Sequence, residues 1–359
     1  MFAKIARLVL APALATVLAV ACGPNEGTVT DPGQSSSSDE AFPVGVSTVM
    51  INEFISAEVW YPAAAASNDT ETYDVRDFAP FAIRSMLTGD APSTFAYAAS
   101  RDSAVASGKF PVVLFSHGFG GFRSQSTFLT AHLASRGMIV IAPDHPSRDL
   151  SAALTGGTFE TDDPQIHLLE SLEFLSNDEE TFANHVDVES VAIVGHSAGG
   201  GTALVAASDE RVDGYVSMAS GRLGPAEENA MPDKPSFFLA GSVDQIVPVA
   251  RTREAFEAAS SPSLFWNIQG VGHNGFDDLC TFGNGLGIVG VAIASGLERL
   301  LEMQPQMRSL GEDGCVPPAR PVAETFPIIK EAIAEWLTAL FAGTPGEPAA
   351  SSDVVVEAK

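Results

Sequence analysis

The chain consists of short apolar runs separated by longer segments in which apolar residues recur every three or four positions. A short apolar run does not fill a helix, and apolar side chains on both of its faces are typical of a strand inside a parallel sheet. About eight such strands are predicted. They cover residues 44–51, 55–60, 112–115, 138–142, 191–194, 214–218, 236–240 and 264–268.

Helices are predicted between these strands, where apolar positions follow the helical period. The predicted helices cover residues 124–136, 166–175, 202–207, 251–259, 289–303 and 324–341, with a helical patch near 78–86. Strands that alternate with helices form right-handed crossovers, and these give a mostly parallel sheet with helices on both faces. The pattern therefore predicts an α/β fold.

The two ends of the chain lack this alternation. Lys4 and Arg7 precede an apolar run over residues 8–21. This is the pattern of a signal peptide, and the run is too short to span a bilayer as a mature helix. Both the segment after it and the C-terminal end are polar and carry glycine and proline. The predicted organisation is a signal peptide at 1–21, a flexible tether at 22–43, an α/β domain at 44–342 and a disordered tail at 343–359.

Cys22 directly follows the small and apolar residues 18–21. This arrangement resembles a bacterial lipobox, in which the cysteine carries a lipid and becomes the first residue of the mature protein. We therefore expect export and a membrane anchor on Cys22, in the periplasm or at the cell surface. Ordinary secretion after cleavage near this position is the alternative.

The other two cysteines, Cys280 and Cys315, are a natural pair for an exported protein. Disulfides form and persist in oxidising compartments, and two cysteines remain if Cys22 carries a lipid. We expect a disulfide between them.

Charge and composition exclude several classes of partner. The formal net charge is −26 and the pI about 4.4, which argues against nucleic acid or an anionic membrane surface as a binding partner. No pair of His or Cys residues has metal-ligand spacing, and no glycine motif has the context of a phosphate or dinucleotide site. We expect no metal and no cofactor, and the sequence leaves the oligomeric state open.

The most specific motif is Gly195-His196-Ser197-Ala198-Gly199, which fits G-x-S-x-G. It lies between the predicted strand at 191–194 and a helix-compatible run. A serine on a sharp strand-to-helix turn needs a strained backbone, and glycines two positions away avoid collisions with neighbouring elements. The turn also leaves Ser197 at a helix N-terminus, which favours developing negative charge. Ser197 is therefore the predicted nucleophile.

A glycine-rich loop follows the predicted strand at 112–115 and runs from Ser116 to Gly121. A loop at this position supplies an N–H group to the oxyanion hole in hydrolases with this motif. We assign the oxyanion donors to the backbone N–H groups of Phe119 and Ala198. Phe119 and His196 are the predicted substrate-binding side chains.

Asp244 and His273 each follow a predicted strand within a glycine-containing turn. Active sites of open parallel sheets lie at the carboxyl ends of the strands. The chain order Ser197, Asp244, His273 is that of a Ser-Asp-His triad on such a sheet. His145, which follows Asp144 at another strand end, is a rival base, but it lies outside this order.

Several segments together resemble one branch of the α/β-hydrolase superfamily. They are residues 57–62 (AEVWYP), 110–121 (FPVVLFSHGFGG), 132–137 (HLASRG) and 142–145 (APDH). The branch contains platelet-activating factor acetylhydrolases, chlorophyllases and bacterial polyester hydrolases. The resemblance implies an α/β-hydrolase fold with a mostly parallel sheet of about eight strands and no large cap domain.

The combined sequence features predict a serine ester hydrolase of the carboxylesterase or lipase-like type, acting on a small-molecule or lipid ester. A phospholipase like platelet-activating factor acetylhydrolase or a polyester hydrolase is the alternative, although Ala198 replaces the bulkier residue typical of polyester hydrolases. A catalytically silent surface binding protein is the alternative from another class. Acyl transfer would use the same residues.

The interval 219–234, where many lipases carry a lid, is short and polar in this chain. We therefore expect an open, lidless cleft bordered by Phe119 and by the loops after Asp244 and His273. A shallow cleft buries few methylene groups, so short acyl or acetyl esters are the expected substrates.

Overall fold

The computed structural model describes residues 41–88, 90–156, 163–222 and 230–359. The predicted signal peptide, Cys22 and most of the predicted tether lie outside the described residues. Within the described ranges, no helix is both long enough and apolar enough to cross a membrane. Residues 41–359 belong to one compact unit.

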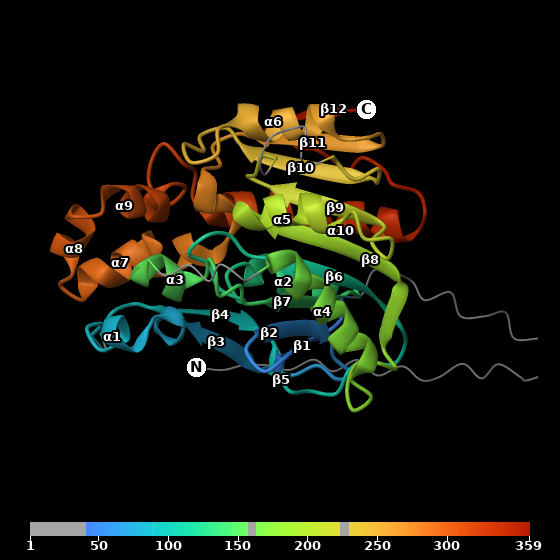
Figure 1. Cartoon of the computed structure of the whole chain (residues 1–359), viewed down its shortest axis with the longest axis horizontal. Coiled ribbons are helices and arrows are strands. Elements are labelled where there is room, and N and C mark those ends of the chain that lie inside the picture. Colours follow the sequence, from blue (N-terminus) through green and yellow to red (C-terminus); the bar gives the residue numbers. More distant parts are fainter. Residues whose placement is uncertain (1–40, 89, 157–162, 223–229) are drawn as a thin grey trace, which may run out of the picture. The chain divides into compact units, whose positions relative to one another are not determined.

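A ten-stranded sheet forms the centre of this unit, in the order β12-β11-β10-β9-β8-β6-β7-β2-β1-β5 (Figure 1). The pairs from β7 through β6, β8, β9 and β10 to β11 are parallel, whereas β1–β2, β2–β7 and β11–β12 are antiparallel. The strands are β1 (Val44–Met50), β2 (Ser56–Pro62), β5 (Ser100–Arg101), β6 (Phe110–Ser116), β7 (Ile139–Pro143), β8 (Val186–His196), β9 (Gly214–Met218), β10 (Ser236–Gly241), β11 (Ser263–Ile268) and β12 (Val354–Ala358). A separate antiparallel pair joins β3 (Thr70–Asp74) to β4 (Thr94–Ala98).

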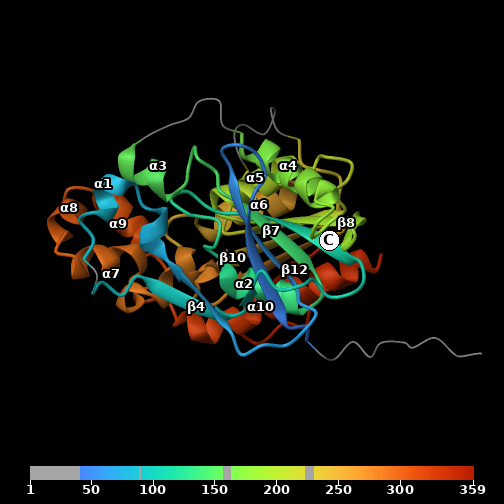
Figure 2. The same cartoon turned by 90° about the horizontal axis from the view of Figure 1, so that it is seen from below.

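Helices cover both faces of the sheet, as the alternation of strands and helices predicted (Figure 2). The helices α4 (Pro164–Asn177), α5 (Ala198–Ala206) and α6 (Val249–Ala258) lie on one face, and α2 (Thr127–Ser135) and α10 (Val322–Phe341) on the other. Successive strand residues point to opposite faces, so Phe237 packs in the core beneath α10 and Phe238 in the core beneath α6. The central strands are therefore apolar on both faces because both faces are covered.

All eight predicted strands are present, and two edge strands bring the sheet to ten. The prediction of a disordered tail at 343–359 is wrong for the last of these residues, because Val354–Ala358 forms β12. This strand pairs antiparallel with β11, whose outer edge is otherwise unpaired. Val354 and Val356 pack against the core, and Val355 points outward. Three consecutive valines thus alternate between the core and solvent as strand residues do.

The segment between β11 and α10 departs most from the prediction. The predicted helix at 289–303 is two helices, α7 (Gly287–Ala294) and α8 (Glu298–Glu302), with Gly296 between them at φ +76°. A third helix, α9 (Pro305–Glu312), follows, and three short 3-10 helices, η2 (His273–Phe276), η3 (Asp278–Thr281) and η4 (Gly283–Gly285), precede α7. Glycine adopts positive φ without the steric cost that other residues bear, so the chain reverses at Gly296.

Helices α7, α8 and α9 lie beside two short helices from earlier in the chain, α1 (Phe81–Arg84) and α3 (Leu150–Thr155). Both views show these five helices together at one end of the unit (Figures 1 and 2). A 3-10 turn, η1 (Val75–Phe78), leads into α1. These segments come from three distant parts of the sequence.

Candidate active site

Ser197 occupies a strained turn between β8 and α5. Its backbone has φ 56° and ψ −123°, and its N–H group donates to the carbonyl of Met218 at 2.9 Å. A Cβ on Gly195 would lie 2.2 Å from the carbonyl oxygen of Gly199, and one on Gly199 would lie 1.9 Å from the carbonyl oxygen of Ser116. Only glycine fits at either position, which explains the spacing of the motif.

The structure brings Ser197, His273 and Asp244 into one hydrogen-bonded row. Ser197 Oγ lies 2.9 Å from His273 Nε2, and His273 Nδ1 lies 2.9 Å from Asp244 Oδ2. Asp244 and His273 are buried, whereas Ser197 is partly exposed. The second carboxylate oxygen, Asp244 Oδ1, accepts the N–H groups of Ile246 and Val247 at 2.9 and 2.7 Å. The carboxylate is therefore fixed from both sides, and the row has the geometry of a nucleophile, a base and an orienting acid.

The loop that carries His273 is held by Asp313, a residue that the sequence analysis missed. Asp313 Oδ1 accepts the N–H of His273 at 2.7 Å, and Oδ2 accepts the N–H of Gln245 at 3.0 Å. The carbonyl oxygen of Asp313 accepts the N–H of Asn274 at 2.9 Å. One carboxylate thus joins the loop of His273 to the loop after Asp244. No motif marks Asp313, because its partners lie 40 and 68 residues earlier in the chain.

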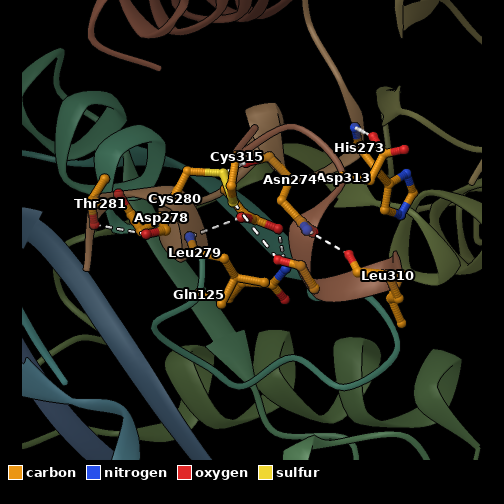
Figure 3. Close-up of a disulfide and its surroundings, with 12 residues drawn as sticks. Gln125, His273, Asn274, Asp278, Leu279, Cys280, Thr281, Leu310, Asp313 and Cys315 are labelled. Atoms are coloured by element: carbon orange, nitrogen blue, oxygen red, sulfur yellow. Dashed lines mark hydrogen bonds between the residues drawn. A yellow bond between two sulfur atoms is a disulfide. The ribbon is translucent and has the colours of Figure 1, made fainter. Parts of the chain in front are cut away.

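Cys280 and Cys315 form the predicted disulfide. Figure 3 shows it between the loop that follows His273 and the loop that carries Asp313. Cys315 lies two residues after Asp313, so the disulfide restrains the chain next to this carboxylate. Asn274 adds a further link, since its side-chain amide donates to the carbonyl of Leu310 in α9 at 2.7 Å (Figure 3).

Two adjacent carboxyl groups in the loop after His273, those of Asp277 and Asp278, are completely buried. Burial raises the pKa of Asp277 well above its usual value, even though it accepts a hydrogen bond from Gln125 Nε2 at 2.6 Å. Burial also raises the pKa of Asp278 to about 7, and its partners are the hydroxyl of Tyr97 and the N–H of Phe128. These groups tie the loop after His273 to α2 and β4.

The predicted oxyanion loop lies against Ser197. A Cβ on Gly118 would stand 3.1 Å from the Cβ of Ser197. In the part of the chain that the structure describes, the backbone N–H groups of Phe119 and Ala198 have no protein acceptor. Ala198 begins α5, where the first N–H groups of a helix lack intrahelical partners. Both N–H groups are therefore free to bind a negatively charged oxygen near Ser197 Oγ.

Arg148 supports the oxyanion loop through hydrogen bonds to several elements. Its guanidinium donates to Ser116 Oγ and to Thr202 Oγ1, both at 2.7 Å, and its carbonyl oxygen accepts the N–H of Gly120 at 2.7 Å. Arg148 thus connects the end of β6, the oxyanion loop and the first turns of α5. It is a second residue in the site region that no sequence motif indicated.

The rival base His145 is fully buried in a cluster of histidines away from the row of Ser197, His273 and Asp244. Its Nε2 lies 2.9 Å from Ser116 Oγ, and its Nδ1 lies 3.2 Å from His167 Nδ1. His117 accepts the backbone N–H of His145 and donates to the carbonyl of Gly118. Burial lowers the pKa of His145 well below its usual value and that of His117 to about 3. The neutral rings of His117 and His145 therefore support the oxyanion loop.

His196, predicted as a substrate-binding residue, is 1% exposed. Its Nε2 donates to the backbone carbonyl of His273 at 3.1 Å, and its Nδ1 lies 3.4 Å from Asp277 Oδ2. Burial and the neighbouring His273 lower its pKa. Its ring lines part of the cavity at Ser197. Its nitrogen atoms contact protein groups instead, and Nε2 binds the loop of His273.

A cavity of about 80 Å³ opens at Ser197. Phe119, predicted as a substrate-binding residue, lines it and is 47% exposed. The loop after His273 borders the cavity as predicted, through His273, Asn274 and Leu279, whereas none of the described residues in the loop after Asp244 lines it. Further walls come from α3, α7, α8 and α9, including Leu150, Ile288 and Leu310. The sequence did not indicate that these helices lie beside Ser197, because they stand far from it in the chain. Residues 223–229 of the interval 219–234 lie outside the described residues.

Among the described residues, no group of three or more His, Cys, Asp or Glu side chains could hold a metal ion.

Comparisons with known proteins identify related sequences and folds. A family model described as platelet-activating factor acetylhydrolase, isoform II, matches residues 56–181, a range that ends before Ser197. Platelet-activating factor acetylhydrolase from Cavia porcellus is 27% identical over 221 residues, which cover 49% of this chain and 50% of the relative. The enzyme of the same name from Canis lupus familiaris is 27% identical over 146 residues, with 29% and 33% covered. The chain thus spans about half or less of the length of these curated relatives.

A solved structure of a ferulic acid esterase from Streptomyces cinnamoneus superposes with a TM-score of 0.63. It is 20% identical, and the match covers 89% of this chain and 98% of that one. At this identity the likeness concerns the fold, and it includes the mostly parallel sheet with helices on both faces. The chain is an α/β-hydrolase by fold, and its sequence resembles the platelet-activating factor acetylhydrolase branch of that superfamily.

Proposed function

We propose that the protein is a serine ester hydrolase that uses Ser197, His273 and Asp244 as its catalytic triad. The observation that carries the proposal is the row of hydrogen bonds from Ser197 Oγ through His273 to Asp244, with two free backbone N–H groups beside the serine. The related proteins named as acetylhydrolases and esterases support ester hydrolysis in particular.

In the first half of the reaction, Ser197 Oγ attacks the ester carbonyl carbon while His273 Nε2 takes the hydroxyl proton. The carbonyl oxygen becomes negatively charged, and the N–H groups of Phe119 and Ala198 donate hydrogen bonds to it. His273 then gives the proton to the leaving alcohol, the carbon–oxygen bond breaks, and the acyl group remains on Ser197.

In the second half, a water molecule attacks the acyl group and gives its proton to His273. The carboxylic acid leaves and the Ser197 hydroxyl is restored. Asp244 holds His273 in the tautomer that carries the proton on Nδ1 and stabilises the imidazolium. Because Asp244 also accepts two backbone N–H groups, it keeps a fixed orientation throughout the cycle.

The strained backbone of Ser197 favours a catalytic protein over a catalytically silent binding protein. Such strain is costly, and it persists where it serves a function. Acyl transfer to an alcohol other than water would use the same acyl-enzyme, and analysis of products with a competing alcohol separates the two reactions. A phospholipase or polyester hydrolase activity would be a choice of ester within the same chemistry.

We further propose that the protein is exported, with a lipid on Cys22 as its membrane anchor. The disulfide between Cys280 and Cys315 supports an oxidising compartment. Changing Cys22 to serine should move the protein from the membrane fraction to the soluble fraction with unchanged specific activity. Retention of this variant on the membrane would contradict the anchor.

Labelling with a fluorophosphonate probe tests the catalytic proposal. The wild-type protein should be labelled at Ser197 and should hydrolyse p-nitrophenyl acetate, and Ser197→Ala should lose both properties. The expected loss of kcat is about 10⁴-fold or more. Ser208→Ala, an exposed serine at the end of α5, is the matched control and should keep full activity. Activity of Ser197→Ala within a few-fold of wild type would exclude the proposed nucleophile.

A further inference from the structure

A second cavity of about 300 Å³ lies next to the cavity at Ser197. Its walls come from η1, α1, α3, α7 and α8 and from the start of α9. We call it the apolar groove, because Gln304 is the single polar residue among the described side chains that line it. No charged side chain of the described residues lines it, so it has nothing to pair with an ionic group.

The apolar groove adjoins the cavity at Ser197, and the two share part of their lining. Leu150, Leu154, Ile288, Leu301 and Met307 line both. Leu150 and Leu154 come from α3, and the other three come from α7, α8 and α9. A molecule whose ester carbonyl lies at Ser197 can therefore extend an attached chain between α3 and α7–α9 without crossing a polar wall.

Part of this surface is also open to solvent. Leu300 in the groove is 47% exposed and Met86 is 41% exposed. A contiguous apolar surface that is partly exposed often marks a binding site, whereas single exposed apolar residues are common on any protein. An aliphatic chain is the ligand that matches such a lining, because it needs no hydrogen-bond partner and gains free energy from each methylene group removed from water.

We propose that the apolar groove binds an aliphatic chain of the ester substrate, so that the preferred esters carry a chain of medium or greater length. This inference rests on the proposed function of Ser197. It replaces the expectation of short acyl or acetyl esters, which depended on a shallow, open cleft. The chain can belong to the acyl part or to the alcohol part of the ester, and the experiment separates these two sources.

Two series of esters test the proposal with the full-length protein. One is p-nitrophenyl acetate, butanoate, octanoate and dodecanoate, and the other is methyl, butyl, octyl and decyl acetate, all below their solubility limits. In the series whose variable chain enters the groove, kcat/KM should rise by up to about fourfold for each methylene group buried. Rates that stay flat or fall with chain length in both series overturn the proposal.

Ala292 and Ala294 provide a matched pair of variants on α7. Ala292 lines the groove and not the cavity at Ser197, whereas Ala294 is exposed and lines neither. Ala292→Phe fills the groove and should lower the ratio of kcat/KM for the preferred long ester to kcat/KM for the shortest ester by tenfold or more. Ala294→Phe should leave this ratio unchanged. Equal ratios in the two variants overturn the proposal.

A second pair covers the case in which Ala292→Phe does not fold. Leu300 in the groove is 47% exposed, and Met303, which is 73% exposed, lines neither cavity. Leu300→Glu places a charge in the groove wall and should lower the same ratio, because the buried chain would meet a carboxylate. Met303→Glu adds the same charge nearby and should not lower it.

Binding of decanoate separates failure of this inference from failure of the proposed function. Calorimetric titration of Ser197→Ala should show that decanoate binds at least tenfold more tightly than butanoate, and that Ala292→Phe in this background removes the difference. Decanoate binding without hydrolysis of any ester by the wild type would retain the groove and reject the catalytic proposal. Ester hydrolysis without selective decanoate binding and without a chain-length trend would do the reverse.

Discussion

Two regions meet at Ser197, and they are built in different ways. The first is the edge of the sheet where β6, β8, β10 and β11 end, and its short connections carry the loop at 116–121, Ser197, Asp244 and His273. The second is the segment from Asp277 to Arg320, with α7, α8 and α9. In this second region α8 and α9 have no buried residues, and the segment is tied down by a disulfide and by Asp313.

The two regions differ in how firmly they hold their side chains, and they therefore control different properties of the protein. Strands that are buried on both faces have few alternative positions, so the side chains at their ends are fixed within the tolerance that catalysis needs. Helices α8 and α9, which have no buried residues, are fixed by a few specific links, and they can change in sequence without disturbing the sheet. We therefore expect substitutions in the first region to affect kcat most, and substitutions in the second to affect stability and choice of ester.

The largest expected effect is a loss of kcat caused by a substitution in the first region. Asp244→Asn should lower kcat by about 10⁴-fold, because the amide no longer holds His273 in the tautomer that accepts the Ser197 proton. Asp213→Asn is the control, since Asp213 is exposed and accepts the N–H of Val191 at the start of the buried part of β8. Steady-state kinetics with p-nitrophenyl acetate compare the two. If Asp213→Asn were the more damaging change, the acid would have been assigned wrongly.

The disulfide gives the next largest effect, and it should appear as stability. The double variant Cys280→Ser/Cys315→Ser opens a loop with a sequence separation of 35. The chain-entropy model gives a loss of about 3–4 kcal/mol in the free energy of unfolding. Urea denaturation monitored by circular dichroism measures it. A loss below about 1 kcal/mol would mean that the helical segment is held by its packing instead.

The variant Asp313→Asn tests whether the segment from Asp277 to Arg320 also positions His273, the proposed base. Asp313→Asn should lower kcat by about 10- to 100-fold with little change in KM, because an amide nitrogen would face one of the two N–H groups that the carboxylate now accepts. Glu312→Gln is the control, since Glu312 pairs with Arg308 on the same helix. A drop in thermal stability with unchanged kcat would assign Asp313 a structural role only.

Asp278 should change how the free energy of unfolding depends on pH. Its pKa is raised from 3.8 to about 7 by burial, so between about pH 4 and pH 7 the folded state keeps a proton that the unfolded chain releases. The free energy of unfolding should therefore fall as pH rises through this range, by up to about 1.4 kcal/mol per pH unit.

Asp278→Asn resembles the protonated carboxyl group and should flatten this slope. Some slope should remain, because the pKa of Asp277 is also raised by burial. Thermal unfolding at pH 4, 5.5 and 7 measures the slope, with the exposed residue Asp90 changed to Asn as the control. Equal slopes in wild type and Asp278→Asn would show that this carboxyl group does not control the pH dependence.

The sequence by itself predicted the eight central strands, the helices between them and the residues of the hydrogen-bonded row at Ser197. This was possible because strands buried on both faces are apolar throughout, and because a strained turn admits only glycine at Gly195 and Gly199. Parallel strands also bring their carboxyl ends to one edge, so chain order alone placed Asp244 and His273 near Ser197.

The tertiary structure decided the rest. β12 exists because β11 offers an open edge to three valines, which are too few to predict a strand on their own. Asp313 acts across 40 residues and Arg148 across three elements, and neither belongs to a local pattern. The apolar groove is formed by α1, α3 and α7–α9 from distant parts of the chain. Its apolar residues look like ordinary core residues in the sequence, because periodicity shows which side of a helix is apolar but not whether protein or substrate covers it.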